Sequence, residues 1–228
     1  MKVSVVIPAY NEEKYIAKCL QSLLNQQEKP DEIIVVNNNS KDKTVEIAKS
    51  YHVRLLHESE QGMIPARNRG FNEALYEVIA RTDADSVVPV TWISTIKKNM
   101  VDEKVVGISA PTFFYDAPFA KIVTLLQIFI FFKLSKIILR HNVLNGPNIA
   151  IRKSAWMKIK NSVCLNDRQV HEDMDLAIHL HKYGTINYVP EMQIDVSARR
   201  IKYNFYSIMT DYLFRWIRTM FFQKHFTS

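Results

Sequence analysis

The chain has 228 residues, of which 47% are hydrophobic and 23% charged, with only 5 glycines and 8 prolines. These values predict one globular domain and exclude a disordered or low-complexity protein. The formal net charge of +7 favours anionic partners such as nucleotides, phosphates or acidic lipid headgroups, and two cysteines are too few for a disulfide framework.

The first half of the chain alternates strands and helices. β-Branched apolar runs predict strands at 3–7, 32–36 and 53–56, a fourth strand that runs into Asp83, and a fifth at 105–109. Apolar positions at helical spacing predict helices near 16–24, 42–50, 61–75 and 92–100. This alternation predicts an α/β fold with a mostly parallel sheet and helices on both faces.

The second half is less regular. Short strands are expected at 149–151, 186–189 and 193–196, and a helix at 173–183 with Gly184 as its C-cap.

At the other end of the chain, Asn11 is expected to be the N-cap of the first helix. Nothing in the first residues resembles a signal peptide, because the first strand begins at once. With the cysteine usage, this predicts a cytoplasmic protein.

Two segments of the second half combine apolar and basic residues. Residues 122–132 are strongly apolar and are flanked by Lys121, Lys133 and Lys136. This segment is too short to span a bilayer, so it is either a core helix or a helix that lies at a membrane surface. Residues 203–226 also have a helical pattern, in which aromatic residues alternate with basic ones.

Two carboxylates, Asp83 and Asp85, stand where the fourth strand should end. Ligands of open α/β sheets bind beyond the carboxyl ends of the strands, and Mg²⁺ is commonly held there by one or two carboxylates together with substrate phosphates. The pair alone also fits a surface turn. Other motifs have to decide between a metal site and a turn.

Several motifs together resemble family 2 glycosyltransferases. They occur in the order of that family and cover roughly residues 3–196: the opening segment 3–12, the second-strand segment 35–42, the segment 66–70, Asp83-Ala84-Asp85, and His171-Glu172-Asp173. The resemblance implies a GT-A fold and inverting transfer from a nucleotide-sugar donor of the UDP or GDP type. It also implies Mg²⁺ or Mn²⁺ as the cofactor and an acceptor that is a sugar or is linked to a lipid.

The resemblance also implies roles for individual residues. Asp85 would hold the ion, Asp83 the ribose or the ion, Asp173 would be the catalytic base, and Glu172 would support it or touch the acceptor. The remaining residues expected at the donor are Pro8, Ala9, Tyr10, Asn11, Glu12, Asn38, Arg67, Ala84 and Gly146. Asn38 stands where many members of the family carry an Asp that binds the nucleotide base, so the identity of the donor's base stays open.

We expect a GT-A domain at 1–200 and an amphipathic helical tail at 201–228. The enzyme would work in cell-envelope, polysaccharide or glycolipid synthesis, docked on the inner face of the cell membrane. One alternative is a sugar-nucleotide nucleotidyltransferase, although that class has a Gly-rich loop where this chain has Pro8-Ala9-Tyr10-Asn11. A second alternative is an inactive scaffold that binds membranes. A nucleic-acid binder is not expected, because the basic residues of the first half form no stripe interleaved with aromatic ones.

Overall fold

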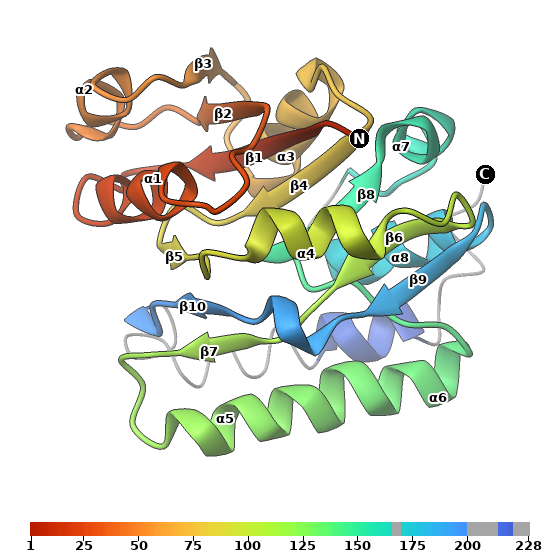
Figure 1. The fold of residues 1–228 in the computed structure, drawn as a ribbon. Coiled ribbons are helices and arrows are strands. Elements are labelled where there is room, and N and C mark those ends of the chain that lie inside the picture. The colour runs from red at the N-terminus through yellow and green to blue at the C-terminus, as the bar shows by residue number, and fades with distance from the viewer. Residues whose placement is uncertain (166–169, 200–213, 221–228) are drawn as a thin grey trace.

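The computed structural model describes residues 1–165, 170–199 and 214–220. In this part of the chain the main sheet has seven strands in the order β3-β2-β1-β4-β8-β6-β9. The strands are β1 (Val3–Ala9), β2 (Glu32–Asn37), β3 (Arg54–His57), β4 (Val78–Thr82), β6 (Val105–Ser109), β8 (Asn148–Arg152) and β9 (Thr185–Tyr188). All neighbours pair in parallel except β8, which is antiparallel to both β4 and β6. The predicted α/β fold with a mostly parallel sheet is confirmed (Figure 1).

Helices cover both faces of this sheet (Figure 1). The apolar side chains of α1 and α4 pack with one face, and those of α3, α7 and α8 pack with the other. The helices are α1 (Ile16–Leu24), α2 (Thr44–Lys49), α3 (Met63–Glu73), α4 (Trp92–Asn99), α7 (Lys153–Ile159) and α8 (Glu172–His181). The strands are therefore buried on both sides, which explains why their sequences are continuous apolar runs.

A second, three-stranded sheet has the order β5-β10-β7. It consists of β5 (Ser86–Val87), β7 (Thr112–Phe114) and β10 (Ile194–Val196), with the short 3₁₀ helix η2 (Pro190–Met192) just before β10. Because β5 follows Asp85 directly, this sheet holds the end of the Asp83–Asp85 turn.

Three predicted boundaries differ from the structure. β1 runs on to Ala9, because Pro8 pairs with β2 while the ladder to β4 has already ended at Val6, so no hydrogen bond is lost at the proline nitrogen. Asn11 is not the cap of α1, which begins only at Ile16; it has a φ of 55° and accepts a hydrogen bond from the Lys41 N–H.

Gly184 is not in the left-handed conformation expected of a C-cap, and the cap of α8 is Lys182. The glycine is needed for a different reason. A Cβ at this position would lie 2.4 Å from the backbone oxygen of Lys104, where the chain enters β9 beside β6. Close approach of two backbones therefore explains this glycine.

A long apolar helix lies below the small sheet (Figure 1). It consists of α5 (Ala120–Leu126), the π-helical segment η1 (Gln127–Leu134) and α6 (Ser135–Leu139). The continuous helix Ala120–Leu139 has 20 residues, and its most apolar 18-residue window has a mean hydropathy of 2.1, so by length and composition it could cross a membrane. The expectation that this segment is too short to span counted only residues 122–132 and is wrong. A core helix is also excluded, because only 17% of its most apolar window is buried.

Most of the predicted C-terminal helix at 203–226 lies outside the described residues. Its described part, 214–220, is helical. Thr219 accepts a hydrogen bond from the His171 N–H at 2.7 Å, and the Trp216 indole donates to Ser135 Oγ at 3.1 Å. This part of the tail therefore packs on the turn that begins α8 and on the apolar helix.

Candidate active site

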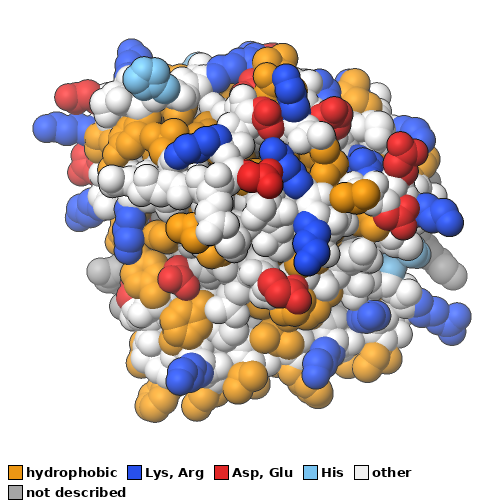
Figure 2. Space-filling model, viewed as in Figure 1, with side chains coloured by type: hydrophobic (Ala, Val, Ile, Leu, Met, Phe, Trp, Pro, Cys, Tyr) orange, Lys and Arg blue, Asp and Glu red, His pale blue; other side chains and the backbone are white. Residues whose placement is uncertain are grey.

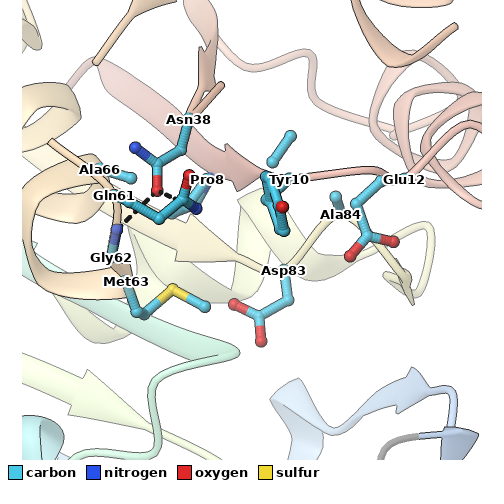
Figure 3. A pocket seen from close by; sticks show the side chains of 11 residues that line it. Pro8, Tyr10, Glu12, Asn38, Gln61, Gly62, Met63, Ala66, Asp83 and Ala84 are labelled. Carbon is cyan, nitrogen blue, oxygen red and sulfur yellow. Dashed lines mark hydrogen bonds between the residues drawn. The ribbon is translucent and has the colours of Figure 1, made fainter. Parts of the chain in front are cut away.

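A pocket opens at the carboxyl ends of β1, β2 and β4 (Figure 3). Its walls come from the β1–α1 loop, the segment before α3 and the turn after β4: Pro8, Ala9, Tyr10, Glu12, Asn38, Gln61, Gly62, Met63, Ala66, Asp83 and Ala84. Parallel strands bring these loops to the same edge of the sheet, where ligands of this architecture bind. Of the residues predicted at the donor, the pocket thus gathers Pro8, Ala9, Tyr10, Glu12, Asn38, Asp83 and Ala84. Asn11 lines a neighbouring hollow instead, together with Arg199.

Asn38 holds one wall of this pocket in place. Its amide nitrogen donates to the carbonyl oxygens of Glu58 and Glu60, and its amide oxygen accepts from Gln61 Nε2 and the Gly62 N–H (Figure 3). Both ends of the side chain are therefore occupied by the segment that leads into α3. An aspartate could not donate the first two bonds. The amide at this position fits a structural task that a carboxylate could not perform.

Asp85 and Glu12 share one cation, the guanidinium of Arg199. Arg199 Nε lies 3.2 Å from Asp85 Oδ2, Arg199 Nη2 pairs with Glu12 Oε1, and the guanidinium stacks 4.4 Å from the centre of the Tyr15 ring. Both carboxylates are buried. Their pairing raises the pKa of Arg199 against the opposing effect of burial. A positive charge is thus already favoured between these two side chains.

This arrangement suits a hard divalent ion. Asp83 and Asp85 offer carboxylate oxygens, which Mg²⁺ and Mn²⁺ prefer, and the guanidinium at Asp85 marks a place where positive charge is stabilised. Among the described residues, no group of three or more His, Cys, Asp or Glu could hold a metal. A bound ion would need further ligands, which diphosphate oxygens and water commonly supply.

Glu172 and Asp173 begin α8 and face two buried arginines. Arg81 of β4 has its Nη1 at 3.2 Å from Glu172 Oε1 and at 3.4 Å from Asp173 Oδ1, and its Nη2 at 3.3 Å from Asp83 Oδ1. Arg67 Nη1 lies 3.4 Å from Glu172 Oε2. We call Arg67, Arg81, Glu172 and Asp173 the charge cluster. Arg67, Arg81 and Asp173 are buried and Glu172 is partly buried, and each charge faces an opposite one, as buried ions require.

The cluster gives its two acids different protonation behaviour. Burial raises the pKa of Asp173 to about 7, and the negative charge of Glu172 adds to this effect against the two arginines. Burial also acts on Glu172, but there Arg81 and Arg67 outweigh it and lower the pKa. Glu172 therefore stays ionised, while Asp173 can take up and release a proton near neutral pH.

Gly146 contacts this acid directly. Its N–H donates to Asp173 Oδ2 at 2.9 Å, and a Cβ on residue 146 would lie 2.6 Å from both carboxylate oxygens of Asp173. Gly146 was predicted beside the donor sugar. The structure places it against the predicted base, and only a residue without a side chain fits there.

Arg67 was predicted to reach the base or the phosphates of the donor. Its side chain is only 1% exposed, is absent from the pocket lining and faces Glu172 and Asn68. We correct this expectation: from α3, Arg67 holds Glu172 rather than the donor.

Arg81 is a residue of the site to which the sequence assigned no role. It is 2% exposed and interrupts the apolar run of β4 two residues before Asp83. A charge inside a buried strand needs a partner of opposite charge, so an arginine within this apolar run could have indicated a buried ion pair. Besides the nearby Asp83, its partners are Glu172 and Asp173 of α8, which lie far along the chain and could not be identified from the strand.

Comparisons with known proteins bear on the family and the fold of the chain. A sequence model of the family described as Glycosyl transferase family 2 matches residues 4–160. The uncharacterized glycosyltransferase YibD of Escherichia coli strain K12 is 43% identical over 100 residues, which are 42% of this chain and 29% of YibD. The chain therefore spans less than a third of that relative.

Several solved structures share the fold. The mannosyltransferase PcManGT from Pyrobaculum calidifontis, in complex with GDP-Man and Mn²⁺, superposes with a TM-score of 0.74 at 19% identity, over 96% of this chain and 62% of that one. S. aureus TarS 1-349, in complex with UDP-GlcNAc, superposes with a TM-score of 0.67 at 21% identity, over 86% of this chain and 58% of that one. The expected GT-A fold is thus confirmed. With the family model matching well over half of its length, this chain belongs to the family 2 glycosyltransferases.

Proposed function

We propose that the protein is an inverting, metal-dependent glycosyltransferase that moves a sugar from a UDP- or GDP-type donor to an acceptor hydroxyl. The observation that carries this proposal is the position of Arg81. Its guanidinium contacts Asp83 of the metal motif and Asp173 of the acidic pair at 3.3 and 3.4 Å. The Arg81 side chain thus joins Asp83, a carboxylate proposed for the donor and its ion, to Asp173, the base proposed for the acceptor.

The donor would occupy the pocket at the end of β1, β2 and β4. Tyr10 and Asn38 line the part beside the β1–α1 loop, and Asp83 lies at its other end (Figure 3). A Mg²⁺ or Mn²⁺ ion held by Asp85 and Asp83 would neutralise charge on the diphosphate leaving group. The structures of similar fold with GDP-Man and Mn²⁺, or with UDP-GlcNAc, support a donor and an ion of these classes.

Asp173 acts as the base in this mechanism. In its ionised form it takes the proton of the acceptor hydroxyl, whose oxygen forms the new bond to the anomeric carbon as the bond to the diphosphate breaks on the opposite side. The Gly146 N–H and Arg81 hold the carboxylate in one orientation. A pKa of about 7 suits this task, because the group is partly ionised at neutral pH and still accepts a proton readily.

The test is a donor screen with released nucleotide as the readout. The protein is incubated with UDP-, GDP- and dTDP-sugars and Mn²⁺, alongside Asp85→Ala and the control Glu103→Ala, an exposed carboxylate outside the site. We expect release with one donor class, loss in EDTA and in Asp85→Ala, and no change in Glu103→Ala. Full turnover in EDTA would contradict the metal, and no release with any donor would contradict the function.

The acceptor class that we propose is a hydroxyl of a cell-envelope polysaccharide or glycolipid. The exposed apolar helix Ala120–Leu139 supports an acceptor close to lipid, since it packs beside the turn that carries Glu172 and Asp173.

A further inference from the structure

One side of the helix Ala120–Leu139 is an exposed apolar surface. Its solvent-facing side chains, together with the residue that precedes the helix, are Phe119, Ile122, Leu125, Leu126, Phe129, Ile130, Ile137 and Ile138. Most follow one another at spacings of three or four, which puts them on one side of a helix. The helix runs along the lower edge of the molecule in Figure 1, and Figure 2 shows hydrophobic side chains along the same edge. We call this surface the apolar edge. Monomeric proteins rarely expose so large a contiguous apolar patch without a function.

The opposite side of the helix is fixed to the domain along its length. Near its start, Thr124 Oγ1 donates to the Thr112 carbonyl oxygen, and Gln127 Oε1 accepts from the Thr112 N–H. Further on, Phe132 packs on Tyr188 at 4.8 Å, and Ser135 Oγ accepts from the Trp216 indole. A helix held in this way cannot stand across a bilayer while the domain stays folded. It can only lie flat on a surface.

The charged side chains of the helix and of Arg140 directly after it are all positive. Lys121, Lys133, Lys136 and Arg140 are exposed, and the sequence contains no Asp or Glu from Ala117 to Asn166. A second copy of the chain docked on this face would oppose these same charges, because a two-fold interface pairs each patch with itself. An anionic lipid surface would instead accept both the apolar side chains and the basic rim.

We propose that the helix Ala120–Leu139 lies in the headgroup plane of an anionic membrane, with the apolar edge inserted and its lysines among the headgroups. The helix also reaches the catalytic turn, since Phe131 packs 5.2 Å from the ring of His171, next to Glu172. Docking therefore holds the acceptor side of the site near the lipid surface. This last consequence rests on the proposed function, whereas membrane binding itself does not.

The experiment is sedimentation of the full chain with phosphatidylglycerol-containing vesicles and with phosphatidylcholine vesicles, at low and high salt. The test variant is Leu125→Glu/Phe129→Glu. Its control is Leu75→Glu/Val101→Glu, because Leu75 is 62% exposed and Leu125 64%. A second pair compares Lys133→Glu/Lys136→Glu with Lys41→Glu/Lys49→Glu, which changes net charge equally at exposed lysines elsewhere.

We expect the wild type to sediment with anionic vesicles at low salt and to be partly released at high salt. Both edge variants should lower the partition coefficient by roughly tenfold or more, while both controls keep it. Circular dichroism melts of every variant confirm that the fold is retained. The readout uses neither donor nor acceptor, so a failed donor screen does not affect it.

Three outcomes would overturn the proposal. The wild type could stay in the supernatant with anionic vesicles at low salt. The edge variants could bind as well as their controls. Analytical ultracentrifugation could reveal a dimer that Leu125→Glu/Phe129→Glu dissociates, which would assign the apolar edge to a second copy of the chain.

Discussion

The donor pocket and the charge cluster differ in how their carboxylates are neutralised. The pocket is open and Asp83 lines it, whereas Asp85, which follows the lining residue Ala84, is buried and pairs with Arg199. The charge cluster is closed, and Arg67 and Arg81 pair with Glu172 and Asp173 before any substrate arrives. In the pocket the substrate can therefore complete the charge balance, whereas in the cluster the protein itself sets it.

Because of this difference, substitutions in the two regions should affect different properties of the protein. A change in the cluster alters protonation and packing, because a buried charge that loses its partner is strongly destabilising. A change in the pocket alters the affinity for ions and nucleotides. The predictions below test this division.

The largest expected effect is that of Asp173→Asn on turnover. The amide keeps the shape of the side chain but cannot take a proton from the acceptor, so we expect transfer to slow by roughly 10²–10⁴-fold with donor affinity nearly unchanged. Single-turnover kinetics and donor titration measure the two quantities separately.

Asp175→Asn is the matched control for this variant. Asp175 is also buried and lies on the same helix, but its carboxylate accepts from the Cys164 N–H and lies outside the charge cluster. Its variant should turn over at close to the wild-type rate. Near wild-type turnover in Asp173→Asn would remove Asp173 from the mechanism.

The next effect concerns packing in the cluster. Gly146→Ala would place its Cβ 2.6 Å from both carboxylate oxygens of Asp173, so either the loop or the acid must move. Overpacking of this kind costs about 1–3 kcal/mol of stability, and turnover should fall because the base is displaced. Chemical denaturation and turnover measure the two effects.

Gly107→Ala separates this effect from a general intolerance of alanine. In β6 the nearest atoms to an added Cβ are 3.7 Å away, which is ordinary contact. We expect it to change stability little and turnover not at all. Equal losses in both variants would show that the contact between Gly146 and Asp173 has no special importance.

The smallest effect lies beside the pocket, at Arg199. Arg199→Met removes the guanidinium that pairs with Asp85 and Glu12, so Mn²⁺ alone should bind several-fold more tightly, because it no longer competes with a nearby positive charge. Isothermal titration calorimetry measures this affinity without turnover.

Arg54→Met is the control, because Arg54 also pairs with two carboxylates, Glu32 and Glu73, but outside the site. It should leave Mn²⁺ binding unchanged. Weaker Mn²⁺ binding by Arg199→Met would mean that Arg199 supports the ion site rather than competing for it.

The two regions also differ in how much the sequence predicted. The strand pattern and the motifs at Pro8, Asn38 and Asp83 predicted the sheet and the edge where the pocket lies, because each motif directly follows its own strand. Each of these relations joins neighbouring residues of the chain, so it can be read from the sequence. The same reasoning placed Asp173 at the start of a helix.

The cluster was only half predicted, because its contacts join segments far apart in sequence. Nothing near Arg81 or Arg67 in the chain identifies Glu172 as their partner. Gly146 was predicted at the donor, since a glycine shows only that space is short and not which neighbour fills it. The extent of the apolar helix was missed because Lys133 and Ser135 interrupt the apolar run without ending the helix.

The most direct test of the central claim, that the charge cluster tunes Asp173 as the base, is the pH dependence of transfer in single turnover. The pKa of Asp173 is raised to about 7, and the ionised form is active, so the wild-type rate should increase as the pH rises through about 7. Glu172→Gln removes a neighbouring negative charge and should move this inflection to lower pH, whereas Arg81→Gln removes a positive charge and should move it to higher pH. Profiles with the same inflection in all three proteins, or a wild-type rate that falls over this range, would contradict the account.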